Sequence, residues 1–105
     1  RRFFVLILSI AKSLPREYRF EIASQLIRAG LSVLLNIAEG SGKHSDAELN
    51  RFFDIALGSL FEAVAAVDGL REASLVSEGI FSKVEVQAAE ISDQLGGFKK
   101  KLRRL

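Results

Sequence analysis

The fold is decided by the C-terminal stretch of residues 81–105, which reads FSKVEVQAAEISDQLGGFKKKLRRL. Apolar side chains recur along it at alternating spacings of three and four residues. The members of this stripe are Phe81, Val84, Ala88, Ile91, Leu95, Phe98, Leu102 and Leu105. Such a seven-residue repeat predicts a long amphipathic helix that packs nearly parallel to its neighbours.

The same spacing continues upstream and predicts three more helices. Residues 46–73 carry an alternating stripe of Leu49, Phe53, Ala56, Leu60, Ala63, Val67 and Leu70. Ser45 begins a capping box with Glu48, and Ser77 is a plausible N-cap for the last helix. Pro15 separates a first helix from a second. We therefore expect one all-α domain over residues 1–105, an antiparallel up-down-up-down four-helix bundle with helices at about 1–13, 16–40, 46–73 and 78–104.

The second predicted helix carries apolar residues on two faces, which indicates that it is covered on most sides. One stripe, assigned to the core, is Phe20, Ala23, Ile27, Gly30, Leu34 and Ile37. The other stripe, Ile22, Leu26, Ala29 and Val33, is predicted to form an interface between copies of the chain. The hydrophobic content of 49% supports this surplus apolar surface.

Composition excludes several kinds of chemistry. The chain has no cysteine and one histidine, so disulfides, thiol catalysis and thiolate or all-histidine metal sites are ruled out. The sequence GSGKHS at 40–45 lacks the strand and the glycine spacing of a phosphate-binding loop. His44 is expected to be a solvated turn residue. We expect no enzymatic activity, no metal and no cofactor.

Charge is distributed unevenly along the chain. Residues 1–43 carry a balance of +4, residues 44–98 a balance of −7, and residues 99–105 a balance of +5. The five C-terminal cations are Lys99, Lys100, Lys101, Arg103 and Arg104. They exceed what a helix C-terminus needs, so we predict that they contact the backbone of a nucleic acid.

Several short runs resemble the bacterial four-helix bundle family named for the 23S ribosomal RNA intervening sequence. The runs are Leu14-Pro15, Ser24-Gln25, the segment NIAEGSG at 36–42, Arg51-Phe52-Phe53 and the segment IALGSL at 55–60. The resemblance implies a barrel-like homopentamer without known enzymatic activity, and a suspicion of RNA binding. The family is also similar in fold to the accessory variability determinant of diversity-generating retroelements, which binds nucleic acid and a reverse transcriptase.

The family segments suggest further residues. Arg28, which remains where the family has two adjacent arginines, and Lys43 join the predicted nucleic-acid contacts. A structural role is predicted for Asn36, Glu39, Gly40, Arg51 and Ser59. We expect Asn36 and Glu39, which share a helix face, to hydrogen-bond across to the region of Arg51 and Ser59 on the next helix.

These features favour a cytoplasmic, homo-oligomeric scaffold or RNA-associated adaptor without a membrane partner. The first apolar run is too short to span a bilayer. An alternative is an accessory protein that binds a protein partner, such as a reverse transcriptase, through its acidic flank.

Overall fold

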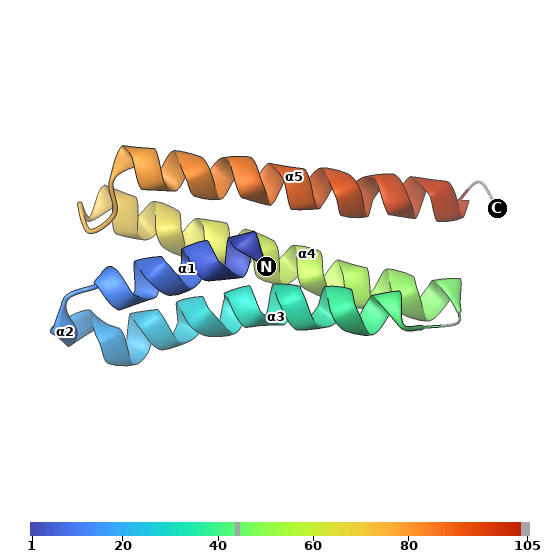
Figure 1. Cartoon of the computed structure of the whole chain (residues 1–105), viewed down its shortest axis with the longest axis horizontal. Coiled ribbons are helices and arrows are strands. Elements are labelled where there is room, and N and C mark those ends of the chain that lie inside the picture. Colours follow the sequence, from blue (N-terminus) through green and yellow to red (C-terminus); the bar gives the residue numbers. More distant parts are fainter. Residues whose placement is uncertain (44, 104–105) are drawn as a thin grey trace.

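The computed structural model describes residues 1–43 and 45–103, with side chains described as far as Gly97. Within that part the chain is an all-α four-helix bundle, which confirms the predicted fold class. Its elements are α1 (Arg2–Ser13), α2 (Arg16–Tyr18), the π-helical turn η1 (Arg19–Ala23), α3 (Ser24–Ser41), α4 (Asp46–Glu72) and α5 (Glu78–Arg103). The segments α2, η1 and α3 follow one another as the second helix of the bundle (Figure 1).

Both predicted serine caps are present. The Ser45 side chain accepts a hydrogen bond from the backbone N–H of Glu48 at 3.2 Å, and Ser77 accepts one from the N–H of Ile80 at 3.1 Å. Each bond satisfies one of the backbone donors that a helix leaves free at its N-terminus. These caps fix where α4 and α5 begin.

The turn between α4 and α5 closes through a left-handed residue. Ser74 has a φ of 62°, and the N–H of Leu75 donates to the carbonyl of Leu70 at 2.8 Å. A helix commonly ends in this way, although glycine is the usual residue at the left-handed position. Ser74 therefore holds a backbone conformation that an L-residue adopts at a cost.

The core follows the predicted seams of α4 and α5. Phe53, Ala56, Leu60, Ala63, Val67 and Leu70 are buried from α4, and Val84, Ala88 and Leu95 are buried from α5. From the first half of the chain, Ile7, Leu14 and Leu26 fill the space between the helices and are almost completely inaccessible to solvent. Burying a side chain of this size stabilises the fold by about 1.5–3 kcal/mol.

The second bundle helix is rotated relative to the prediction. Its buried positions are Ala23, Leu26, Gly30, Val33 and Gly40, a seam that combines members of both predicted stripes. Phe20, which was assigned to the core, is 88% exposed. The π-helical turn adds a residue to the helical turn there, so that positions on its two sides no longer share one regular stripe.

This rotation corrects the predicted contacts between copies. Leu26 is 1% exposed and Val33 is 3% exposed, because both pack into the core of their own chain. Neither offers surface to a second copy. Ile22 and Ala29 are half-buried and pack against the same core, so their role in an interface stays a prediction.

Two glycines allow helices to approach closely. A Cβ on Gly40 would lie 2.9 Å from a ring carbon of Phe53, and one on Gly30 would lie 3.1 Å from Ile7. In the described part of the chain no glycine has a positive φ. Gly40 is needed for space and not for backbone freedom.

The stretch Arg16–Ser41 is long and apolar enough to cross a membrane by length and composition, with a mean hydropathy of 1.2. A core helix of a bundle passes the same test. Here the stretch packs against α1 and α4, and 22% of its most apolar 18-residue segment is buried in the bundle. We therefore treat it as a bundle helix with an uncovered outer face.

Candidate nucleic-acid interface

A polar cluster lies on the seam between α3 and α4. The Oγ atoms of Ser32 and Ser59 are 2.7 Å apart, and Nδ2 of Asn36 donates to the Ser32 carbonyl at 2.8 Å and to Ser32 Oγ at 3.1 Å. The predicted link from Asn36 to the Ser59 region thus passes through Ser32. The cluster satisfies half-buried polar groups between two tightly packed helices, so its role is structural.

The other predicted link, from Glu39 to Arg51, is absent among the described contacts. Oε2 of Glu39 instead pairs with Nζ of Lys43 at 3.2 Å. The Lys43 ammonium also lies 5.1 Å from the centre of the Phe52 ring, and the Arg51 guanidinium lies 4.8 Å from the same centre. Phe52 is therefore contacted by two cations, an arrangement that favours the charged groups through the electron-rich ring.

This cluster adds Arg51 and Phe52 to the candidate interface. Lys43 and Phe52 are nine residues apart in sequence, on the two sides of the α3–α4 turn, so spacing alone did not bring them together. The only sequence feature that pointed to this cluster was the adjacency of a basic and an aromatic residue, Arg51 and Phe52. The cluster also gives the basic end an aromatic ring, which the charged tail itself lacks.

The backbone of α5 runs to Arg103 and ends on the same side of the bundle as the α3–α4 turn (Figure 1). The predicted contacts Lys99, Lys100, Lys101 and Arg103 have side chains outside the described residues, and Arg104 and His44 lie outside them entirely. The topology alone therefore places the basic sequence of the tail at the end that also carries Lys43 and Arg51.

Arg28 does not join this end. It lies on α3 about 20 Å before the α3–α4 turn, at a rise of 1.5 Å per residue. There it lines a hollow over the α3–α4 seam together with Gln25, Ser32, Ser59 and Glu62. Its position on α3 therefore does not group Arg28 with the α3–α4 turn.

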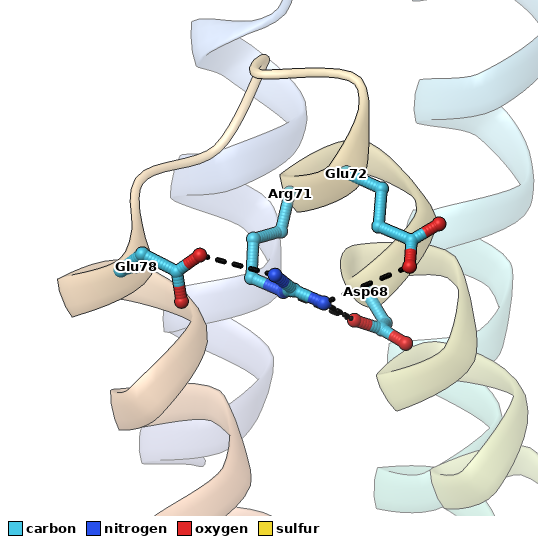
Figure 2. A network of polar contacts seen from close by, with 4 residues as sticks. All are labelled: Asp68, Arg71, Glu72 and Glu78. Atoms are coloured by element: carbon cyan, nitrogen blue, oxygen red, sulfur yellow. Dashed lines mark hydrogen bonds and ion pairs between the residues drawn. The ribbon is translucent and has the colours of Figure 1, made fainter.

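A polar network centred on Arg71 lies at the opposite end of the bundle (Figure 2). Its guanidinium donates to Asp68 Oδ1 at 2.6 Å and to Glu78 Oε1 at 3.0 Å, and it lies 3.9 Å from Glu72. It also stacks 5.0 Å from the centre of the Phe81 ring. The hydrogen bonds that Arg71 donates, first to Asp68 and then to Glu78, raise the pKa of Arg71 above its ordinary value.

The network ties the end of α4 to the start of α5. One cation faces three carboxylates, so the four side chains of this network together carry a net negative charge.

No group of three or more metal-ligating side chains is assembled in residues 1–43 and 45–97. The expectation that the chain lacks a metal, a cofactor and an enzymatic activity stays a prediction. What the described geometry provides is a set of interaction surfaces.

Comparison with protein families identifies the family of this chain. The family model described as the 23S rRNA-intervening sequence protein matches residues 1–97. The chain belongs to this family. The match covers all four bundle helices and stops just before the basic tail.

A solved relative has the same fold. It is a protein of unknown function from the S23 ribosomal protein family of Bacteroides thetaiotaomicron, and it superposes with a TM-score of 0.86 at 24% sequence identity. The alignment covers 94% of this chain and 93% of the relative. The likeness supports the bundle architecture. A comparison with curated proteins finds no match.

Proposed function

We propose that this chain is a non-enzymatic, homo-oligomeric helical scaffold that associates with RNA in the cytoplasm. The observation that carries the proposal is the set of large apolar side chains that the second bundle helix exposes. Leu31 and Leu35, one turn apart on α3, are 38% and 53% exposed, and Phe20 in η1 is 88% exposed. Exposed large apolar side chains on one helix are typical of an interaction surface.

A second copy of the chain offers exposed apolar groups that fit this surface. Its α4 exposes Ile55 and Phe61. Packing the α3 face of one copy on α4 of the next would bury apolar groups on both. Such a head-to-tail contact closes into a ring when the rotation between copies permits it.

RNA association is supported by the family description and by the basic sequence of the tail. The tail supplies five cations, and α5 runs toward the end that holds the α3–α4 turn (Figure 1), near which Lys43 and Arg51 flank Phe52. In a ring, these ends would repeat around one rim and strengthen the attraction for phosphate groups. Because the sequence of residues 99–105 has no aromatic residue that could stack on a base, we expect recognition of the backbone and not of the base sequence.

The oligomer is tested by light scattering coupled to gel filtration. Leu35→Glu places a charge on the uncovered face and should lower the mass toward that of one chain. The matched control is Val5→Glu, which makes the same kind of change at an exposed position of α1. A Leu35→Glu protein with the wild-type mass would contradict this interface.

RNA association is tested by a salt titration with a structured RNA and a duplex DNA. For about five phosphates, the slope of log affinity against log salt should be near −4. Replacing the five tail cations with glutamine should abolish the tight, salt-dependent binding, whereas Lys83→Gln with Lys12→Gln should change it little. Binding that ignores salt, or that survives the tail replacement, would favour the alternative in which the acidic flank binds a protein partner such as a reverse transcriptase.

A further inference from the structure

A hollow lies at the surface where the end of α1 meets the start of the second bundle helix, at the end of the molecule that holds α2 (Figure 1). It measures about 400 Å³ and is lined by Ala11, Lys12, Arg19, Ala23 and Ile27. Pockets that bind small molecules commonly have volumes of about 300–1,000 Å³ and an apolar lining with a few polar groups. The hollow has this size and this kind of lining.

The π-helical turn η1 explains why the hollow is open. Phe20 lies three residues before Ala23 and seven before Ile27, a spacing that would put all three on one stripe of an uninterrupted α-helix. In the wider π-helical turn it is Arg19 that lines the hollow with Ala23 and Ile27, and Phe20 is turned outward into solvent. Turns of this kind are frequent at functional sites. The large apolar side chain that would fill the hollow is thus held away from it.

The floor of the hollow is apolar. Ala11 and Ala23 are buried, and Ile27 is half-buried against the same core. Because two of these three side chains are single methyl groups, they leave the space above them unfilled. An apolar group that enters this space is stabilised in proportion to the apolar area that it removes from water.

Two cations stand at the rim, and neither forms an ion pair among the described residues. The ion pairs of that part of the chain involve only Lys43 and Arg71 as cations. Arg19 donates through Nε to the carbonyl of Leu14 at 3.1 Å, which holds its side chain in place. Its two Nη groups are left to donate to a ligand, and their geometry matches the two oxygens of a carboxylate. The Lys12 ammonium adds a second positive charge.

We propose that this hollow binds a small anionic amphiphile, a carboxylate attached to an apolar chain. The carboxylate lies between Arg19 and Lys12, and the chain runs over the apolar floor toward Ile27. Arg19 and Ile27 are eight residues apart, about 12 Å of helix, so the hollow suits a chain of medium length.

The charges around the hollow favour an anion over a neutral or cationic ligand. Its lining contains two cations and no carboxylate. Glu17 and Glu21, the acidic residues nearest to Arg19 in sequence, do not line it, so neither competes there for the two cations. Binding at this site does not depend on RNA or on assembly.

The probe is decanoate, which is compared with acetate and with decyltrimethylammonium. Acetate has the anionic group without the chain, and decyltrimethylammonium has the chain with the opposite charge. Binding to the full chain is measured by calorimetric titration below the micelle concentration of each compound. NMR spectra locate the site, since decanoate should shift the amide signals of Ala23 and Ile27 and leave that of Val86 on α5 in place.

We expect decanoate to bind at least about tenfold more tightly than either of the other compounds. Lys12→Glu should weaken its binding about tenfold, whereas Lys83→Glu, the same change at an exposed position of α5, should leave it unchanged. Circular dichroism establishes that both variants are folded. The proposal is overturned if decanoate does not bind, if acetate or decyltrimethylammonium binds equally well, or if the two variants lose the same affinity.

Discussion

Replacing Gly40 with alanine should destabilise the bundle, although alanine is the better helix former. The added Cβ would lie 2.9 Å and 3.0 Å from two ring carbons of Phe53 and 3.1 Å from Cβ of Phe52. Alanine gains about 1 kcal/mol in helix propensity, and overpacking a tight contact costs about 1–3 kcal/mol. We expect a net loss of about 1 kcal/mol in the free energy of unfolding.

Gly69→Ala is the matched control on α4. No described atom lies within 4 Å of the added Cβ, so only the propensity gain remains, and the variant should be about 0.5–1 kcal/mol more stable. The two alanine variants should thus differ by about 2 kcal/mol. In a domain of this size each kcal/mol shifts Tm by about 4–8 °C, which gives a difference of about 8–16 °C.

The assay is thermal and urea unfolding followed by circular dichroism, at one fixed chain concentration because assembly also contributes to stability. Phe53→Leu in the Gly40→Ala background should recover part of the loss, so that the double-mutant cycle shows a favourable coupling between the two positions. If Gly40→Ala proves as stable as Gly69→Ala, the close approach of α3 and α4 at Gly40 is not what makes glycine necessary.

Three further changes test individual contacts by the same unfolding assays. Ser74→Gly should stabilise the chain by about 0.5–1 kcal/mol, since the φ of 62° suits glycine; destabilisation would refute a left-handed residue at this turn. Ser59→Ala should cost about 1 kcal/mol, because it removes the partner of Ser32 Oγ, and an unchanged urea midpoint would show that this hydrogen bond contributes nothing. Gln87→Leu should raise the stability of the chain by about 1 kcal/mol by removing Oε1, which is buried without a hydrogen-bond partner among the described residues, and a loss of stability would indicate that this oxygen has a partner in solution.

The formal net charge of +2 is the sum of unlike segments, +4 over residues 1–43, −7 over residues 44–98 and +5 over residues 99–105. In the folded chain three carboxylates surround Arg71 near the α4–α5 turn, and two cations flank Phe52 near the α3–α4 turn.

The sequence by itself determined the helices of this protein and the seams of α4 and α5. A repeat of three and four residues is a property of the chain alone, and caps such as Ser45 and Ser77 act on backbone groups within three residues. The family segments likewise pointed to the polar cluster around Asn36 and Ser59.

Only the tertiary structure decided which face of the second bundle helix is buried. That helix has two apolar stripes, and the choice between them depends on the π-helical turn and on the fit of Gly30 and Gly40 against neighbouring helices. Tertiary packing also brought Lys43 and Arg51 to one aromatic ring. Such features arise between segments distant in sequence, where no local spacing or propensity specifies the contact.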